Sequence, residues 1–225
     1  MKNIAIAIDG PAGSGKSTVA KIISKDLNII YLDTGAMYRA FGLYALRRNA
    51  DTKNWEILEK LLDDFCVDIK YVNGEQKVFL ENEDVSGLIR TNEVSRAASD
   101  VAVVPAVRLK MVDMQRTIAE GKSVVMDGRD IGTYVLPNAD LKIFLNASTE
   151  ERARRRYLEL SEKGDFSLTE EQIKEDIIKR DKNDSEREFA PLRQAEDAIL
   201  VDTTKMGIDE VTAEIKRLVD GIYSR

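Results

Sequence analysis

The clearest chemical signal in the sequence is a glycine-rich run that matches the pattern G-x-x-x-x-G-K-[ST]. It reads Gly10-Pro11-Ala12-Gly13-Ser14-Gly15-Lys16-Ser17-Thr18. Glycines let backbone amides turn toward phosphate oxygens, and a helix opening near Lys16 would add the positive end of its dipole. Lys16 would place a charge at the outer phosphates, and the Ser17 hydroxyl would bind Mg²⁺. The run predicts a site for ATP or GTP with magnesium; an ordinary glycine-rich turn is the weaker alternative.

Three further segments combine arginine with aspartate. They are Asp33 to Arg39, Asp127 to Gly132 and Arg180 to Arg187. Arginine binds phosphate through two parallel hydrogen bonds, and aspartate can orient hydroxyls or accept from an amino group. Taken singly, such pairs are more often structural ion pairs. Beside a phosphate-binding loop, they predict a second site for a small anionic acceptor. Asp33 or Asp127 is also a candidate for supporting magnesium or acting as a general base.

The composition limits the chemistry that is available. The chain has 225 residues, with 34 Lys and Arg against 40 Asp and Glu, and a formal net charge of −6. It contains no histidine and one cysteine, Cys66. Ser-His-Asp and Cys-His triads and His-based metal sites are therefore excluded. An acidic chain is also a poor candidate for binding a nucleic-acid backbone or an anionic membrane over a broad face.

The sequence predicts a cytoplasmic protein. The apolar run in MKNIAIAIDG is short and is broken by Asp9. No stretch approaches the roughly 18 to 20 apolar residues that span a bilayer, and no small-residue cleavage site is evident. A single cysteine cannot form an internal disulfide, which fits a reducing compartment. We expect neither a membrane nor a nucleic-acid partner.

Short β-type runs alternate with longer helical patterns, which predicts an α/β fold with a parallel sheet covered by helices. The predicted strands are Ile4 to Ile8, Ile29 to Leu32, Ser123 to Met126, Leu141 to Leu145 and Ile199 to Val201. An aspartate directly follows several of them, at Asp9, Asp33, Asp127 and Asp202. Ligands of open α/β sheets lie beyond the carboxyl ends of the strands, so these aspartates are candidates for the site, with a turn-forming role as the alternative.

Apolar residues at three- and four-residue spacing predict helices with one buried face. The rows are Val19, Ile23 and Leu27; Trp55, Leu58, Leu62 and Phe65; and Val107, Met111, Met114 and Ile118. Ser148-x-x-Glu151 and Thr169-x-x-Gln172 are typical of capping boxes. We therefore expect helices to begin before Arg152 and before Ile173.

Two segments depart from this rhythm. Val67 to Val85 alternates apolar and polar residues around Asn73-Gly74, which predicts a small antiparallel insertion with a tight hairpin turn. Arg152 to Arg193 mixes dense charge of both signs with Gly164 and two short predicted helices. This second segment is either a solvated surface or a mobile lid.

The glycine-rich run alone does not choose among GTPases, larger ATPases and small kinases. A guanine-reading Asn-Lys-x-Asp motif is absent from the sequence. Larger ATPases usually need a longer chain, so a small kinase fits best. More than one function stays open at this point. The protein could be a kinase whose acceptor is a nucleotide, a sugar or a shikimate-type acid. It could instead be a nucleotide-dependent switch or an RNA-associated factor that binds nucleotide without multiple turnover.

A family resemblance becomes specific when the motifs are taken in order. GPAGSGKST, LDTGAMYRA, RTNEVSRAASDVAVVPAVR, MDGRDIGT and IKRDKNDSEREFAPL resemble bacterial cytidylate kinases, which make CDP from CMP. The resemblance covers nearly the whole chain from Ile4 onward. It implies the nucleoside monophosphate kinase fold, with a five-stranded parallel sheet in a single domain over residues 1–225. It also implies a monophosphate-binding insertion at about 64–105 and a short lid at about 152–190.

The resemblance also implies roles for individual residues. ATP with Mg²⁺ would bind at residues 10–18, with Ser17 on the metal, and CMP or dCMP would be the acceptor. Cytosine would be read by Ser99, Arg108 and Asp130, the acceptor phosphate would be held by Tyr38, Arg39, Arg129, Arg180 and Arg187, and the sugar would contact Asp184. Thr34 would lie near the entry for base or phosphate. The implied catalytic residues are Lys16, Arg129, Arg180 and Arg187. We expect a monomer.

Overall fold

The computed structural model describes residues 3–72, 74–162 and 164–223. The chain divides into two compact units. We call Met1–Ile30 together with Lys122–Arg225 the P-loop unit, and Tyr31–Gly121 the insertion unit. In the described ranges, no helix is both long and apolar enough to span a bilayer.

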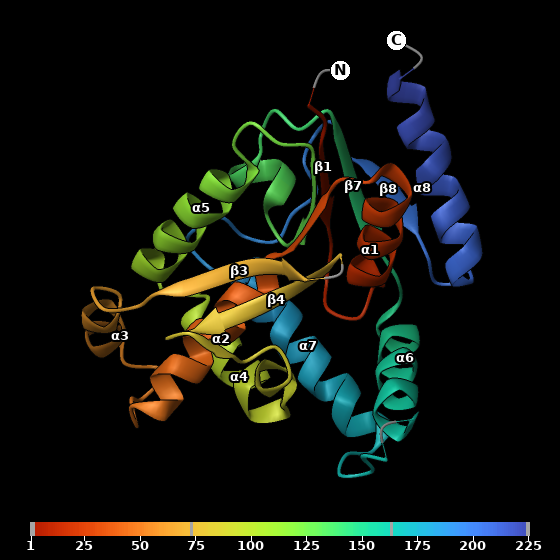
Figure 1. Ribbon diagram of the computed structural model, residues 1–225. Helices are drawn as coiled ribbons and strands as arrows, with labels where there is room; N and C mark the ends of the chain where they lie inside the picture. The colour runs from red at the N-terminus through yellow and green to blue at the C-terminus, as the bar shows by residue number, and fades with distance from the viewer. Residues whose placement is uncertain (1–2, 73, 163, 224–225) are drawn as a thin grey trace. The chain divides into compact units, whose positions relative to one another are not determined.

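A parallel sheet organises the P-loop unit (Figure 1). Its strands are β1 (Ala5–Asp9), β6 (Val124–Gly128), β7 (Leu141–Asn146) and β8 (Ile199–Asp202). With β2 (Ile30–Asp33), the described strands follow the order β2-β6-β1-β7-β8. β1 pairs in parallel with β6 and β7, and β7 pairs in parallel with β8. The predicted α/β fold and its strands are confirmed, with ends that differ by one or two residues.

The strand-end aspartates lie within the last residues of their strands. Asp9 and Asp202 end β1 and β8, and Asp127 is the penultimate residue of β6. The register places Ile8 of β1 opposite Asp127. β1 is the central strand of the sheet, and its Ile6 and Ile8 are therefore fully buried.

Four α-helices of the P-loop unit surround or extend from this sheet in the described residues. They are α1 (Lys16–Leu27), α6 (Thr149–Glu162), α7 (Glu170–Glu186) and α8 (Ile208–Tyr223), and a single π-type turn, η2, spans Ile131–Val135. Figure 1 shows α1 and α8 next to one another and α6 beside α7. Leu160, Ile173 and Ile177 form a small apolar core between α6 and α7.

The helices α6 and α7 are longer than the charged segment suggested. They contain 14 and 17 residues, so the expectation of two short helices was wrong. Their starts agree with the predicted caps: Thr169 forms a capping box with Gln172, and Ser148 Oγ accepts from the Glu151 N–H at 3.2 Å. Dense i,i+3 and i,i+4 ion pairs such as Glu151 with Arg154 and Arg155 allow a highly charged sequence to stay helical.

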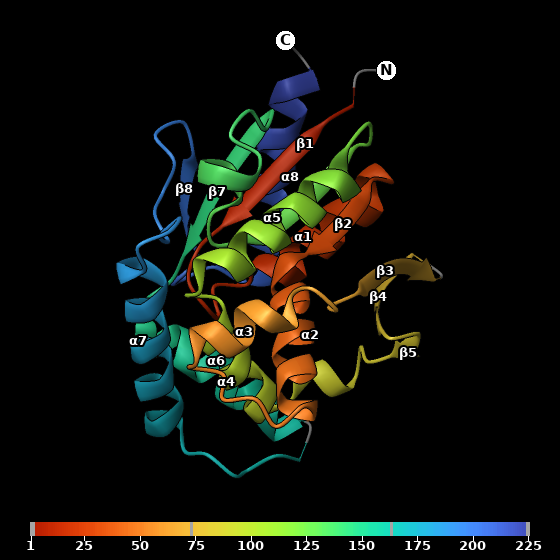
Figure 2. The same cartoon turned by 90° about the vertical axis from the view of Figure 1, so that its left-hand side faces the viewer.

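The insertion unit contains the predicted antiparallel sheet (Figure 2). β3 (Val67–Val72) pairs with β4 (Glu75–Leu80), and β4 pairs with the short β5 (Glu83–Asp84). The hairpin is confirmed, although Asn73 of the predicted turn lies outside the described residues. The helical elements of this unit are α2 (Thr34–Arg47), α3 (Trp55–Leu61), η1 (Leu88–Arg90), α4 (Asn92–Val101) and α5 (Pro105–Ala119).

Only part of each predicted apolar row is buried, because Leu27, Leu62, Met114 and Ile118 are half-buried. Val19, Ile23, Val107 and Met111 are almost completely shielded from solvent. Trp55, in contrast, is 46% exposed, so its assignment to the core was wrong. The helix α3 begins at Trp55 and ends at Leu61, so the row that continued to Phe65 is not one helical face.

Candidate nucleotide-binding site

The first six residues of the glycine-rich run form the loop between β1 and α1, and Lys16, Ser17 and Thr18 begin α1, as predicted. Gly10 and Gly13 have φ values of 147° and 78°, a backbone conformation that favours glycine. A Cβ on Gly10 would lie 2.0 Å from the Leu145 carbonyl oxygen, and one on Gly13 would lie 3.1 Å from Arg152 Cβ. The loop therefore packs closely against β7 and α6: a side chain at Gly10 is excluded, and one at Gly13 would be crowded and would strain the backbone.

Lys16 is buried at the start of α1. Its Nζ donates to the Pro11 carbonyl oxygen at 2.6 Å and to Ser14 Oγ at 3.3 Å. Burial, together with the positive charges of Arg129 and Arg180, lowers the pKa of Lys16 to about 7. An anionic phosphate in the loop would favour the charged ammonium and relieve this cost. The phosphate-binding role of Lys16 stays a prediction.

Ser17 and Asp127 provide a pair of oxygen groups beside the loop. Ser17 Oγ donates to Asp127 Oδ2 at 2.8 Å, which joins the first turn of α1 to the end of β6. Hydroxyl and carboxylate oxygens are the protein ligands that Mg²⁺ prefers. The pair fits a hard divalent cation, and nothing in it suits a soft metal.

Arginines and aspartates of the P-loop unit form a buried charged cluster. Arg129 Nε donates to Asp184 Oδ2 at 2.8 Å, and Arg187 Nη2 donates to Asp130 Oδ1 at 3.2 Å. Arg187 Nη1 also lies 3.8 Å from Asp184 Oδ1. Burial alone would raise the pKa of Asp184, but Arg129, Arg180 and Arg187 together hold it below its usual value. The structure therefore brings together five residues that the sequence assigned to the acceptor nucleotide.

The remaining predicted acceptor residues lie in the insertion unit. Thr34, Tyr38 and Arg39 belong to α2, Ser99 belongs to α4 and Arg108 belongs to α5. Asp33 caps α2 by accepting from the Ala36 N–H and also pairs with Arg39 Nη2 at 2.8 Å. The Arg108 guanidinium lies 5.5 Å from the centre of the Tyr38 ring and is almost fully buried. Arginine is rarely buried to this degree without a partner, and Arg108 Nη1 donates to the Ala102 carbonyl oxygen at 3.2 Å.

Arg152 is a residue that the sequence interpretation missed. Its Nη1 donates to the Ala12 carbonyl oxygen of the phosphate loop at 3.1 Å and pairs with Asp181 Oδ2 at 2.6 Å. Its Nε donates to the Ala147 carbonyl oxygen at 2.9 Å. It therefore connects the loop, α6 and α7. The sequence offered no specific signal, because Arg152 stands in a run with three other arginines.

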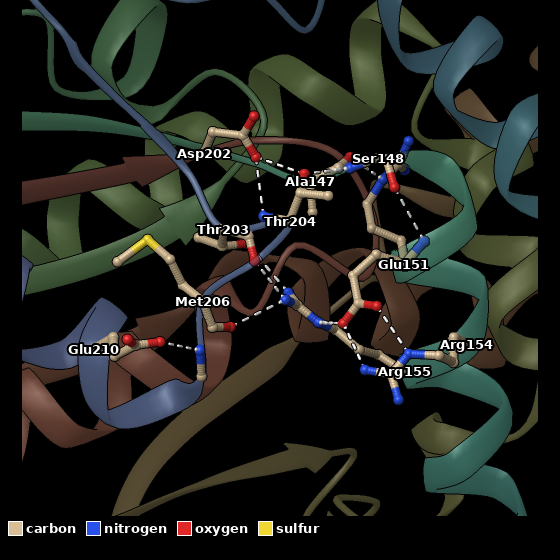
Figure 3. A network of polar contacts seen from close by, with 12 residues as sticks. Ala147, Ser148, Glu151, Arg154, Arg155, Asp202, Thr203, Thr204, Met206 and Glu210 are labelled. Atoms are coloured by element: carbon tan, nitrogen blue, oxygen red, sulfur yellow. Dashed lines mark hydrogen bonds and ion pairs between the residues drawn. The ribbon is translucent and has the colours of Figure 1, made fainter.

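A second polar network fixes the start of α6 to the loop after β8 (Figure 3). Arg155 reaches from α6 to Thr203, donating to its carbonyl oxygen at 2.7 Å and to its hydroxyl at 3.1 Å. Glu151 accepts from both Arg154 and Arg155, and these hydrogen bonds, the one from Arg154 above all, lower its pKa to about 2. Thr204 Oγ1 accepts from the Ser148 N–H at 3.0 Å. The base of the α6–α7 pair is thereby anchored.

Similarity to solved structures supports the fold. A shikimate kinase from Bacteroides thetaiotaomicron superposes with a TM-score of 0.51 at 14% identity and covers 98% of each chain. A gluconokinase from Sinorhizobium meliloti gives a TM-score of 0.51 at 13% identity and covers 98% of this chain and 96% of its own. At such low identity, the likeness concerns the fold alone.

Sequence relatives identify the family. The cytidylate kinase of Caldicellulosiruptor bescii is 52% identical over 218 residues, 97% of this chain and 96% of its own. A cytidylate kinase of Bacillus cereus is 50% identical over 224 residues, 100% of this chain and 99% of its own. The family model for cytidylate kinase matches residues 6–221. With the phosphate loop and the arginine cluster in place, this chain belongs to the cytidylate kinase family.

Proposed function

We infer that the protein transfers the γ-phosphoryl group of ATP to the 5′-phosphate of CMP or dCMP, forming CDP or dCDP for pyrimidine nucleotide metabolism. One observation carries this proposal beside the family: Ser17 of the phosphate loop donates to Asp127 Oδ2 at 2.8 Å, and Arg129, two residues further along, donates to Asp184 Oδ2 at 2.8 Å. A donor-phosphate loop and a cluster of phosphate-binding arginines therefore share one charged environment. Such an arrangement suits the transfer of a phosphoryl group between two anions.

Phosphoryl transfer depends mainly on positioning and on neutralising charge. We assign Lys16 to the moving group and Arg129, Arg180 and Arg187 to the charge that develops on it. An acceptor phosphate is already ionised, so a general base is not required. This explains how a chain without histidine can catalyse the reaction.

We also propose that Mg²⁺ accompanies ATP, with the Ser17 hydroxyl as its protein ligand and Asp127 behind it. In the described residues, no group of three or more His, Cys, Asp or Glu forms a metal cage. That fits Mg²⁺, which in nucleotide sites keeps several waters and substrate phosphates as ligands. When bound, the ion would offset phosphate charge.

Recognition of the acceptor is assigned by its chemistry. Cytosine presents an amino donor beside two acceptors, so a carboxylate at Asp130 and a guanidinium at Arg108, with the Ser99 hydroxyl, would fit it. Uracil reverses the donor and acceptor at two of these positions, and each buried mismatch costs roughly 1 to 3 kcal/mol. We propose that Asp184 contacts the sugar and that Thr34 lies near the entry for the base or the phosphate. The residues assigned to the acceptor phosphate are Tyr38, Arg39, Arg129, Arg180 and Arg187.

We propose that residues of about 64–105 act as the monophosphate-binding insertion and residues of about 152–190 as the lid. The anchoring of α6 through Arg152 and Arg155 gives such a lid a fixed base. Closure over the nucleotides would exclude water, which competes as an acceptor. The cytoplasmic location and the monomeric state stay predictions.

An acceptor panel tests the proposed function. Release of ADP from ATP with Mg²⁺ would be measured with CMP, dCMP, UMP, AMP, shikimate and gluconate. We expect CMP or dCMP to give the highest kcat/KM. Preference for UMP, AMP or a non-nucleotide acceptor would overturn the cytosine assignment. Nucleotide binding without multiple turnover on any acceptor would instead indicate a switch protein.

A further inference from the structure

Asp9 ends β1 and directly precedes the phosphate loop, yet none of the roles proposed above uses its carboxylate. It is 4% exposed. Its Oδ1 accepts from the Ile131 N–H at 2.8 Å, and its Oδ2 accepts from the Gly132 N–H at 2.7 Å. Both oxygens of one buried carboxylate are thus committed to two consecutive backbone amides.

These two amides open the turn η2, whose preceding residue is Asp130. Asp130 occupies the N-cap position, but its side chain makes no capping hydrogen bond in η2. Asp9 therefore supplies from β1 the capping that a local residue normally provides. The Asp130 carboxylate is left for Arg187, which donates to it at 3.2 Å.

The fit around the Asp9 carboxylate is close. A Cβ on Gly132 would lie 3.3 Å from Asp9 Oδ2, and 3.2 Å and 3.1 Å from Cγ and Cδ of Lys142. Asp9 of β1 and Lys142 of β7 therefore both restrict the position of residues 130–132. One buried group links the loop for the donor phosphates, at Gly10, to the segment that carries Arg129 and Asp130.

We propose that Asp9 is a positioning residue for the acceptor nucleotide: by holding the amides of Ile131 and Gly132, it sets the orientation of Arg129 and Asp130 without touching the substrate. The proposal rests on the proposed function, because it requires Arg129 and Asp130 to bind CMP. Two acceptor oxygens are needed. An asparagine at this position has one, and its amino group would face the second amide.

The test is the kinetics of Asp9→Asn with both substrates varied. We expect KM for CMP to rise by about 10- to 100-fold, because small misplacement of a binding group has effects of this size. KM for ATP should change by less than about threefold, the pattern of a lost acceptor interaction. Asp140→Asn is the matched control: its Oδ2 accepts from the Ala5 N–H at the other end of β1, and its kinetics should match the wild type.

A double-mutant cycle with Asp130→Ala separates positioning from a general loss of structure. Because Asp9 acts in part through Asp130, the two substitutions together should raise KM for CMP by less than the product of their separate effects, since coupled residues are not additive. Additive effects, or equal increases in KM for ATP and CMP, would overturn the inference. If instead Asp130→Ala alone leaves CMP kinetics unchanged, the cytosine assignment fails, which is a separate result.

Gly132→Ala keeps the proposal testable if Asp9→Asn does not fold. This variant keeps Asp9, but the added methyl group would crowd Asp9 Oδ2 and the flexible Lys142 side chain. We expect the same selective rise in KM for CMP, of about 3- to 10-fold. An unchanged KM for CMP in a folded Gly132→Ala protein would count against the inference.

Discussion

Ser17 Oγ donates to Asp127 Oδ2 across 2.8 Å and so joins the phosphate loop to the end of β6. Asp33, the other carboxylate considered for a role with magnesium, instead pairs with Arg39 and caps α2. The contacts therefore favour Asp127 as the carboxylate that works beside Ser17. This distinction was not available from the sequence, where both aspartates follow a strand.

Asp127→Asn should lower kcat by about 100-fold, because it removes a negative charge from the site while keeping the side-chain size. The concentration of Mg²⁺ that gives half-maximal rate should also increase. Initial rates against Mg²⁺ at saturating ATP and CMP check both effects. Asp26→Asn serves as the control, because Asp26 is an exposed residue of α1 that pairs with Lys216 of α8. An unchanged dependence on Mg²⁺ would contradict the assignment of Asp127.

Lys16→Ala should abolish turnover while the protein stays folded. The Lys16 side chain contacts Pro11 and Ser14 of the same loop through the two hydrogen bonds of its Nζ, so we expect β1, the loop and α1 to fold without it. We expect a loss of at least about 1,000-fold in kcat, as for a charge that stabilises phosphoryl transfer. Lys21→Ala, on an exposed position of the same helix, is the control. Circular dichroism and a coupled assay for ADP measure the two properties.

Much of the fold could be predicted because its signals are local. Continuous apolar runs predicted the strands, the Thr169 and Gln172 pair predicted the start of α7, and the pattern of residues 10–18 predicted the loop before α1. The alternation around Gly74 predicted the hairpin of β3 and β4. Each of these signals lies within a few residues, so no knowledge of tertiary contacts was needed.

The parts that sequence reasoning missed depend on contacts between distant segments. Arg152 binds the carbonyl oxygen of Ala12, 140 positions away, and Asp9 caps amides at Ile131 and Gly132, more than a hundred positions away. Trp55 was assigned to the core because the spacing of apolar residues does not show whether another segment covers them; it is the first residue of α3 and is 46% exposed. The individual roles of the predicted acceptor residues stay predictions, although several of them share one charged cluster.

Asp130→Ala should weaken CMP far more than ATP. The carboxylate is buried and paired with Arg187, so its removal eliminates the acceptor proposed for the cytosine amino group. A lost hydrogen bond to a charged group costs about 1.5 to 3 kcal/mol, which corresponds to roughly 10- to 100-fold in KM for CMP. Steady-state assays with CMP and UMP measure the selectivity. If the ratio of the two kcat/KM values does not change, Asp130 does not read the base.

The ionisation of Asp9 predicts a dependence of stability on pH. Burial raises the pKa of Asp9 to about 7, against the two backbone hydrogen bonds that lower it. A carboxyl with a raised pKa binds its proton more tightly in the folded state. Its contribution to stability is therefore complete below its unfolded pKa of about 4 and is lost as the pH rises through about 7.

Asp9→Asn removes this titration. The free energy of unfolding of the wild type, relative to Asp9→Asn, should fall by up to about 3 kcal/mol between pH 5 and pH 8. Urea denaturation of both proteins at the two pH values measures the difference. A difference that stays constant with pH would show that Asp9 is ionised in the folded protein throughout this range.

The hairpin of the insertion unit also predicts a measurable effect on acceptor binding. Gln76 Oε1 accepts from the Asp33 N–H at 2.8 Å, and Tyr71 donates its hydroxyl proton to the Tyr31 carbonyl oxygen at 2.9 Å. These side chains hold the backbone of β2 at Tyr31 and Asp33, and the Asp33 side chain pairs with Arg39. The hairpin therefore supports an arginine that we assign to the acceptor phosphate.

Gln76→Ala removes the acceptor for the Asp33 amide and should lower the free energy of unfolding by about 1 kcal/mol. Because Arg39 is then held less firmly, KM for CMP should rise by about threefold or more while KM for ATP stays unchanged. Lys77→Ala is the matched control, since consecutive residues of β4 point to opposite faces of its sheet. Chemical denaturation and steady-state kinetics are measured on both variants. If both variants lose the same stability and leave KM for CMP unchanged, Gln76 supports only the hairpin, and Arg39 is positioned by α2 alone.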